Sequence, residues 1–235
     1  MKYFAIRRRR CAFLAQFEPP DGRRFSQKQR SMKIITIPPT TFSSNSYIIT
    51  KDNQTAIVID PSPRAETELS RRGIIPACVL LTHCHFDHVV GVSSLQAQGA
   101  KVYCSAEEKP LIGTQADVAR LFGAPSPQYA VDETFAKDES KTLCGLQVQA
   151  LQTAGHTKGS VCYLISDGDD KALFTGDTLF AGTIGRTDFP TGNTATLMQS
   201  LKRLKNLSGD YPVYAGHGEE TTLQTERESN PFLQE

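Results

Sequence analysis

The stretch 81–88, with the sequence LTHCHFDH, constrains the fold of this chain more than any other feature. Four potential metal ligands, His83, His85, Asp87 and His88, fall within six residues, directly after an apolar run. Side chains alternate between faces along extended backbone, so His83 and His85 are predicted to point the same way at a strand end. A turn then places Asp87 and His88 at the start of a helix. The spacing predicts ligands directed at two neighbouring points in space.

The donor chemistry of this stretch indicates a catalytic type of metal site. Neutral imidazole and carboxylate are the usual ligands of zinc and iron, whereas thiolate-rich sets are typical of structural zinc. Three of the five histidines of the chain lie here, so a polar loop with chance histidines is the weaker interpretation. Cys84, between two of the ligands, is predicted to point away from the metals and into the core.

Three further candidate ligands each follow a glycine at the end of a predicted strand: His156, Asp177 and His217. Glycine allows the backbone to turn tightly and to approach a bound ion closely. Loops at strand ends on a rigid sheet are also where functional sites are commonly built. Because all five histidines of the chain occur in such places, the sequence predicts that they belong to one site.

From residue 32 the chain alternates short apolar runs with helical patterns. Strands are predicted at 32–37, 46–50, 55–59, 79–82, 101–104, 146–152, 161–166, 172–175 and 211–215, with strand edges closing 128–144. Helices are predicted at 65–72, through 95–99, at 106–121, 195–207 and 222–228. Two strand-rich halves, each with helices, imply an α/β fold of two sheets packed face to face with helices outside. No linker divides 32–235, which is expected to form one domain.

The charge of the chain is distributed unevenly. Residues 1–31 carry nine Lys or Arg against two acids, a charge of +7, which leaves −6 for residues 32–235. An acidic body argues against a nucleic-acid surface, and no apolar run reaches the roughly 18–20 residues of a membrane span. The basic segment 1–31 is expected to be a disordered extension or a consequence of an early start codon, with a targeting presequence as the alternative.

Cysteine usage bears on the cellular compartment. Six cysteines are scattered along the chain without a Cys-x-x-Cys pair, a pattern typical of reduced thiols rather than a disulfide framework. A cytoplasmic location is therefore expected. A mitochondrial or other organellar location is the alternative if residues 1–31 act as a presequence.

The set His-x-His-x-Asp-His, Gly-His, Gly-Asp and Gly-His resembles the metallo-β-lactamase fold, and most closely its glyoxalase II-like hydrolases. The resemblance extends from Met32 to the C-terminus and includes Asp60-Pro61, 174–180, the loop 184–190 and 230–233. It implies a four-layer αββα sandwich with two mixed sheets. It also implies two divalent metal ions, zinc in the first place, with iron or manganese as alternatives.

The resemblance assigns roles to individual residues. It implies that His83, His85 and His156 hold one metal, that Asp87, His88 and His217 hold the second, and that Asp177 bridges them. Asp60 is implied to orient a ligand imidazole through its other ring nitrogen. Asp87 and Asp177 are expected to take part in catalysis.

The sequence departs from glyoxalase II proper at the substrate side. Only eighteen residues follow His217 in this sequence, so the chain is expected to lack the C-terminal helical extension of that family. Arg186 and Asp188 stand in the loop where the family has Lys and Tyr, and Gly218 and Glu219 stand where a Tyr follows the last histidine. Arg186 is a candidate for binding a substrate carboxylate, and a structural pairing with Asp188 or with a backbone carbonyl is the alternative. Lys158 is predicted to be a solvated surface residue.

The expected function is hydrolysis of a small-molecule thioester of the glutathione type by a hydroxide held between the metals. A persulfide dioxygenase with mononuclear iron is the alternative, since it shares the Gly-Arg-Thr-Asp-Phe loop. A nuclease of the same fold is disfavoured by the acidic body, and a non-catalytic binding protein by the complete ligand set. Hydrolysis of β-lactams is disfavoured because His88 follows Asp87, where zinc β-lactamases of the commonest subclass differ. No nucleic-acid or membrane partner is expected, and the sequence leaves the oligomeric state open.

Overall fold

The computed structural model describes residues 32–126 and 128–234 of the chain. The first sheet contains β1 (Lys33–Ile37), β2 (Ser46–Thr50), β3 (Thr55–Ile59), β4 (Ile75–Leu80), β5 (Lys101–Ser105) and β6 (Glu133–Phe135), in this order. The second has the order β14 (Thr221–Thr222), β13 (Pro212–Ala215), β10 (Asp170–Gly176), β9 (Val161–Asp167), β8 (Leu146–Gln152) and β7 (Ser140–Leu143). A small hairpin pairs β11 (Leu179–Phe180) with β12 (Thr183–Ile184).

Both large sheets are mixed, as expected. In the first sheet β1, β2 and β3 are antiparallel neighbours, whereas β3 to β6 run parallel. In the second, β7 to β10 are antiparallel, and β13 joins β10 in parallel. The α-helices are α1 (Pro63–Arg72), α2 (Phe86–Val89), α3 (Val92–Ala97), α4 (Thr194–Lys205) and α5 (Leu223–Ser229). Four 3-10 turns complete the described chain: η1 (Lys109–Leu111), η2 (Gln115–Asp117), η3 (Ala119–Phe122) and η4 (Pro231–Leu233).

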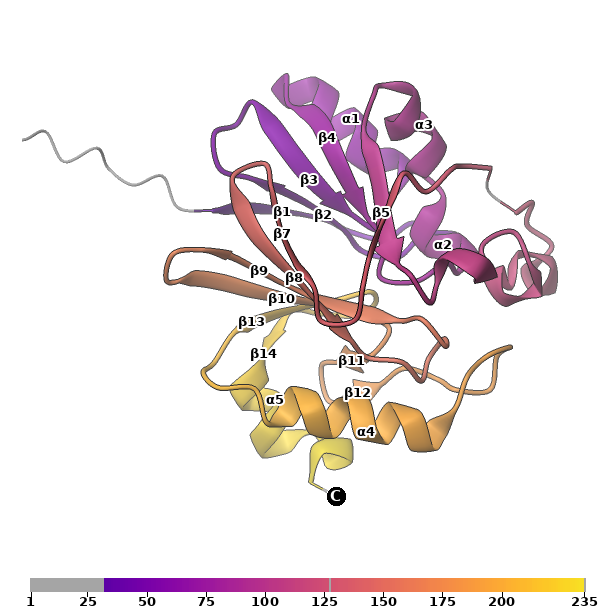
Figure 1. Ribbon diagram of the computed structural model, residues 1–235, viewed down its shortest axis with the longest axis vertical. Coiled ribbons are helices and arrows are strands. Elements are labelled where there is room, and N and C mark those ends of the chain that lie inside the picture. The colour runs from indigo at the N-terminus through magenta and orange to yellow at the C-terminus, as the bar shows by residue number, and fades with distance from the viewer. Residues whose placement is uncertain (1–31, 127, 235) are drawn as a thin grey trace, which may run out of the picture.

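The elements stack in four layers, seen from top to bottom in Figure 1 as α1 with α3, the first sheet, the second sheet, and α4 with α5. The period-two alternation of strand side chains produces this order. In β3, Ile57 and Ile59 pack between the sheets, while Ala56 and Val58 pack under the outer helices. The predicted αββα sandwich is therefore confirmed.

The outer helices are held by apolar stripes. Leu197, Leu201 and Leu204 of α4 are buried against the outer face of the second sheet, as their spacing of three and four predicted. Asn193 caps the N-terminus of α4, and its side chain accepts a hydrogen bond from the Thr196 amide, 2.9 Å away. Gly73 caps the C-terminus of α1, where the backbone is left-handed with φ of 65°.

Two of the predicted elements are wrong in detail. The helices expected at 106–121 are the 3-10 turns η1, η2 and η3, because Pro110 and Gly113 interrupt the pattern and Val118 adopts a left-handed φ of 52°. The strand expected at 79–82 instead spans Ile75–Leu80. Pro76, which lacks an N–H, is accommodated there by an irregularity in the pairing of β3 with β4.

Several expectations concern features other than secondary structure. No helix in the described ranges is long and apolar enough to cross a membrane. Cys78, Cys84, Cys104, Cys144 and Cys162, the cysteines in the described ranges, are free thiols. The interpretations offered for segment 1–31 lie outside the described residues.

Candidate metal centre

The seven predicted ligands converge at one edge of the two sheets, where several strands end. His83 and His85 lie in the loop after β4, and Asp87 and His88 lie on α2. The other three follow strands of the second sheet: His156 after β8, Asp177 after β10 and His217 after β13. The parallel pairing of β10 with β13 brings the last two loops side by side. The structure thus brings together every residue that the sequence proposed as a ligand.

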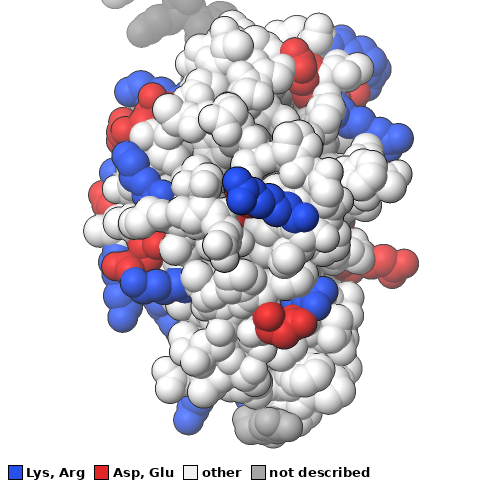
Figure 2. All heavy atoms as spheres, turned by 90° about the vertical axis from the view of Figure 1, so that its right-hand side faces the viewer, with Lys and Arg blue, Asp and Glu red and all other residues white. Residues whose placement is uncertain are grey.

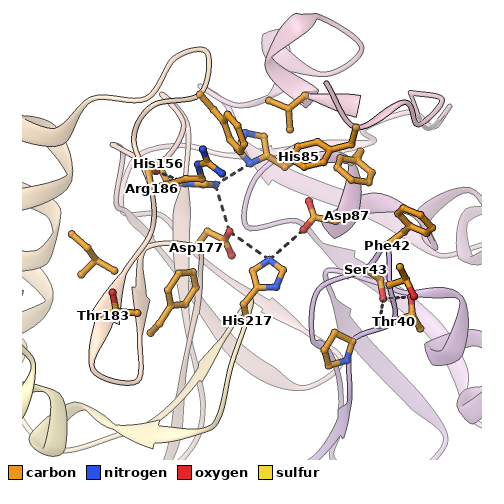
Figure 3. A pocket seen from close by; sticks show the side chains of 18 residues that line it. Thr40, Phe42, Ser43, His85, Asp87, His156, Asp177, Thr183, Arg186 and His217 are labelled. Atoms are coloured by element: carbon orange, nitrogen blue, oxygen red, sulfur yellow. Dashed lines mark hydrogen bonds and ion pairs between the residues drawn. The ribbon is translucent and has the colours of Figure 1, made fainter. Parts of the chain in front are cut away.

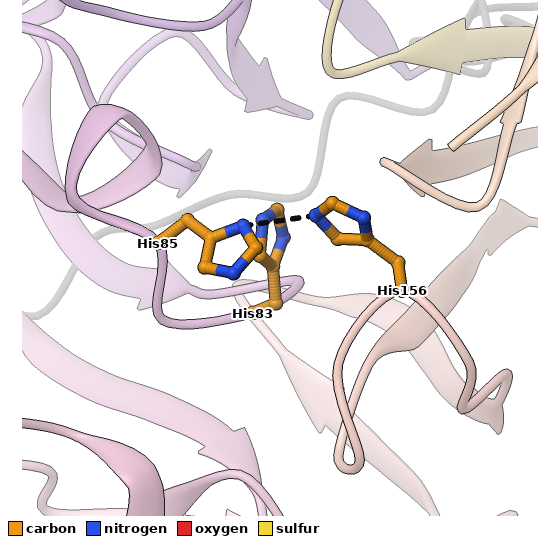
Figure 4. Close-up of side chains that lie close together, drawn as sticks. All are labelled: His83, His85 and His156. Atoms are coloured by element: carbon orange, nitrogen blue, oxygen red, sulfur yellow. Dashed lines mark hydrogen bonds between the residues drawn. The ribbon is translucent and has the colours of Figure 1, made fainter. Parts of the chain in front are cut away.

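His83, His85 and His156 form the first group, with ligand atoms within 4.8 Å of one another. Figure 4 shows the three rings converging, two from the loop after β4 and one from the opposite sheet. The ring planes lie at 81–86° to one another, and His85 Nδ1 is 2.9 Å from His156 Nε2. All three side chains are buried. Three imidazoles that face one point leave a further coordination position open, as in catalytic zinc sites.

Asp87, His88 and His217 form the second group. His217 Nε2 lies 3.2 Å from Asp87 Oδ2, and His88 Nε2 lies 3.7 Å from the same oxygen. Asp177 lies between the two groups, with carboxylate oxygens 3.3 Å from His88 Nε2 and 3.6 Å from the Nε2 atoms of His156 and His217. Figure 3 shows Asp177 between His156 on one side and His217 on the other. This is the geometry expected of a bridging carboxylate.

Buried atoms without partners provide an independent test of whether the cluster fits a metal. In the described part of the chain, the buried side-chain atoms that lack a hydrogen-bond partner include four of this cluster, His83 Nε2, His85 Nε2, His88 Nε2 and Asp177 Oδ1. Buried polar atoms in proteins are almost always satisfied, so orphaned atoms that face one another need an explanation. A divalent cation satisfies imidazole and carboxylate lone pairs together. The donor set therefore fits a divalent-metal site.

The other ring nitrogen of several ligands is fixed by a hydrogen bond. His88 Nδ1 donates to Asp60 Oδ2 at 2.8 Å, and His156 Nδ1 donates to the main-chain oxygen of Arg186 at 2.7 Å. Asp60 also accepts from the amide and the hydroxyl of Thr82, so its carboxylate is held from three directions. These bonds leave the Nε2 lone pairs of His88 and His156 directed into the site. Asp60 thus lies where an orienting residue was predicted.

The electrostatic surroundings of His83, His85 and Asp177 favour the protonation states that metal binding requires. Burial lowers the pKa of His85 to about 3, and burial with the neighbouring histidines lowers the pKa of His83 well below its usual value. Burial alone would raise the pKa of the Asp177 carboxyl, but His88, His156 and His217 outweigh it and lower that pKa. Neutral imidazoles and ionised carboxylates are the forms that coordinate a metal. His88 is the exception: burial would lower its pKa, but Asp177, Asp87 and Asp60 outweigh burial and raise that pKa well above its usual value, so a metal ion bound there must displace a proton.

Two glycines beside the ligands occupy positions that no larger residue fits. A Cβ atom at Gly216 would lie 2.2 Å from Asp177 Oδ1 and 2.7 Å from His88 Cε1. At Gly155 it would lie 2.4 Å from the backbone of Leu197, and φ is 139°. Glycine at 216 thus lets the backbone approach the ligand side chains, whereas glycine at 155 lets it approach helix α4.

Glu108 is a residue of this site that sequence reasoning missed. Its side chain is buried, and its carboxylate accepts from the Cys84 amide at 2.8 Å, the Thr157 hydroxyl at 2.7 Å and the Gly159 amide at 3.0 Å. It thus connects the loop of His83 and His85 to the loop of His156. In the sequence it is one of two adjacent glutamates in a polar turn, and no local signal separates it from Glu107.

The cluster forms the base of a pocket of about 680 Å³. Arg186 lines this pocket, and its guanidinium donates two hydrogen bonds of 2.6 Å to the Asp188 carboxylate. Arg186 therefore forms the pair with Asp188 that was considered as the alternative to binding a substrate carboxylate. Lys158 is exposed, with its amine 3.6 Å from Glu107, and Cys84 is buried away from the ligand groups.

Comparisons with known proteins agree with this geometry. A family model described as the metallo-beta-lactamase superfamily matches residues 39–217. Hydroxyacylglutathione hydrolase GloC of Haemophilus influenzae is 36% identical over 210 residues, a match that covers 86% of this chain and 98% of that protein. Among solved structures, BLEG-1 B3 metallo-beta-lactamase has a TM-score of 0.79 at 32% identity, with 86% of this chain and 100% of that chain covered. TTHA1623, solved in a di-iron-bound form, has a TM-score of 0.72 at 34% identity and the same two coverages.

The metal-ligand geometry, the four-layer sandwich and the family match lead to one conclusion. This chain belongs to the metallo-beta-lactamase superfamily.

Proposed function

We propose that this protein is a binuclear metal-dependent thioesterase that cleaves thioesters of the glutathione type. The observation that carries the proposal is the pair of facing ligand groups with Asp177 between them, at the base of an open pocket. The similarity to hydroxyacylglutathione hydrolase GloC supports the thioester as substrate. The relative that was solved with two irons supports the loading of both groups.

The residues would hold the metals as the sequence suggested: His83, His85 and His156 one ion, and Asp87, His88 and His217 the other. Asp177 would contact both. Two such ions, when bound, supply a water of lowered pKa and polarise the substrate carbonyl. The reaction adds water across the C–S bond, so that the carbonyl carbon gains oxygen, the sulfur leaves as a thiolate, and a carboxylate and a thiol result.

Asp87 would assist this reaction from the open side of the site. Its side chain is partly exposed and lines the pocket. Burial alone would raise the pKa of Asp87, but His88 and His217 outweigh it and lower that pKa, so the carboxylate is ionised at neutral pH. It can therefore orient the attacking water and accept its proton. A thiolate leaves without strong acid help, because the pKa of a thiol is only about 8.5.

The experiment measures metal content and hydrolysis of S-lactoylglutathione by the purified protein. Two ions per chain and release of free thiol are expected, and the variants His83→Ala and Asp177→Ala should lose both. Lys158→Ala is the matched control, because Lys158 lies two residues from His156 with its side chain exposed. Survival of thioesterase activity and metal content in both ligand variants would show that the assignment is wrong.

The same preparation separates the competing functions of this fold. One iron per chain with oxygen uptake on glutathione persulfide would identify the oxygenase instead. Hydrolysis of a chromogenic β-lactam without hydrolysis of thioesters would identify a β-lactamase, the activity in the name of the BLEG-1 relative.

A further inference from the structure

The wall of the pocket above the metal ligands is unusually aromatic. Five phenylalanines line it: Phe42, Phe86, Phe122, Phe180 and Phe189. Phe42 and Phe122 are 62% and 53% exposed, and they are two of the five large apolar side chains that are exposed among the described residues. Solvent-exposed apolar side chains that gather around a pocket indicate a binding surface.

Part of this wall begins at the metal site itself. The ring of Phe189 meets the ring of His85 edge to face, with centroids 5.7 Å apart. Phe122 meets Phe189 in the same way at 6.0 Å, and Phe86 supports Phe122 at 5.3 Å. The rings of Phe189 and Phe122, here called the aromatic wall, thus lead outward from a metal ligand. A substituent only a few atoms from a carbonyl held at the metals would reach this wall.

Cationic side chains are scarce in the same pocket. Arg186 is the only Lys or Arg that the described residues contribute to the pocket lining. Its guanidinium is paired with Asp188 and lies over the ring of Phe189, 3.8 Å from the centroid. The two guanidinium N–H groups that face Asp188 are therefore already hydrogen-bonded. An anionic substituent at the wall would find no unpaired cation among these residues.

The surface around the pocket has the same character. Helix α2, which contributes Phe86 and Asp87 to the pocket, lies toward the right-hand side of Figure 1. Figure 2 shows that side face on: uncharged surface fills most of the view, and most charged side chains gather toward its edges. Long-range electrostatic attraction of a highly charged substrate is thus weak on this face.

We propose that the site selects thioesters whose acyl group is bulky, uncharged and apolar, an aryl or arylalkyl group that packs on the aromatic wall. This inference rests on the thioesterase function proposed above and specifies its substrate class. We assign the acyl group to the wall, because the wall offers apolar rings beside His85 whereas a polar thiol carrier needs hydrogen-bonding partners. The thiol carrier extends from the other side of the reacting carbonyl carbon toward the open pocket, where Thr40, Thr41 and Ser43 offer polar contacts.

The first measurement compares two substrates with the same thiol, S-phenylacetylglutathione and S-lactoylglutathione. The metal-loaded protein should show a kcat/KM about 10- to 100-fold higher for the phenylacetyl ester, the range expected for filling an apolar pocket. In Phe122→Ala the ratio of the two values should fall about tenfold. Leu121→Ala is the matched control, because Leu121 is the adjacent residue, is 66% exposed and does not line the pocket. The ratio should not change in that variant.

The second measurement does not depend on hydrolysis. Calorimetry with phenylacetate and lactate should give tighter binding of phenylacetate to the metal-loaded protein, and Phe122→Ala should remove most of that difference. If the protein cleaves no thioester but shows this preference, the proposed function fails and the apolar subsite stands. If both acids bind equally and both thioesters are cleaved at equal kcat/KM, the thioesterase stands and the aromatic wall is not an acyl site.

Discussion

Replacement of Glu108 tests whether its carboxylate holds the first metal group in place. In Glu108→Ala the amides of Cys84 and Gly159 lose their acceptor, while the Thr157 hydroxyl keeps a contact with Ser160 Oγ at 2.7 Å. Each orphaned buried donor costs roughly 1–3 kcal/mol, so the alanine variant should lose about 2–6 kcal/mol of unfolding free energy. That is a large part of the ~5–15 kcal/mol typical of a domain.

Glu108→Gln is the sharper probe because it preserves volume. The amide retains one acceptor oxygen but turns an NH₂ group toward at least one of the three donors that Glu108 now satisfies. A loss of about 1–3 kcal/mol is expected. The substitution should displace the loop that carries His83 and His85 and also the loop that carries His156. Zinc affinity at the first group should therefore fall about 10- to 100-fold. The second group, which Glu108 does not contact, should be affected less.

The assay is a zinc titration against a competing chelator, with thermal unfolding of the metal-free and zinc-loaded forms measured in parallel. Glu107→Gln is the matched control, because Glu107 precedes Glu108 directly and its side chain is 59% exposed. If Glu108→Gln binds zinc as tightly as this control, and its stability falls equally in the metal-free and loaded forms, then Glu108 supports only the fold and the reasoning is refuted.

Three further predictions concern the surroundings of the ligands. Gly216→Ala should weaken metal binding, because the added Cβ would displace Asp177. Gly218→Ala is the control, because the Cβ added there meets open space and only the φ of 81° is strained. This control should lose about 1 kcal/mol of stability without losing metal content. Asp60→Asn should reduce metal affinity about 10- to 100-fold, read by chelator competition. The amide has one acceptor oxygen, so its NH₂ group must face either the Thr82 amide or the pair formed by the Thr82 hydroxyl and His88 Nδ1. Asp188→Asn should free the Arg186 guanidinium to bind an anionic acyl group. The ratio of kcat/KM for S-succinylglutathione to kcat/KM for S-phenylacetylglutathione should then rise by up to about fivefold. An unchanged ratio would show that the ion pair does not govern selectivity.

The convergence of the candidate metal ligands could be predicted from the sequence because it depends on local pattern. His83 and His85 are two residues apart after an apolar strand, and His156, Asp177 and His217 each follow a glycine. Strand alternation and strand ends therefore predicted where these side chains gather. The sandwich was predictable for the same reason, since strands such as β3 carry apolar side chains on both faces.

Features that depend on long-range packing could not be predicted in this way. Glu107 and Glu108 are identical residues in one turn, and only the tertiary fold buries the second between two distant loops. The segment 106–121 has enough apolar residues for a helix, but Val118 adopts a left-handed conformation that local propensity does not predict. Charge and spacing alone could not decide whether Arg186 pairs within the protein, as it does with Asp188, or binds a substrate carboxylate.

The two ligand groups also have a mechanical consequence for the sandwich. Each group draws from both halves of the chain: His83 and His85 meet His156, and Asp87 and His88 meet His217. A bound ion would therefore be a reversible cross-link between the sheets, and in the first group it would join His85 to His156, which are 71 residues apart in the sequence. Unlike a disulfide, such a cross-link has a strength that rises with the free-ion concentration. The stability of the packing between the two sheets would then depend on the concentration of free metal ion around the protein.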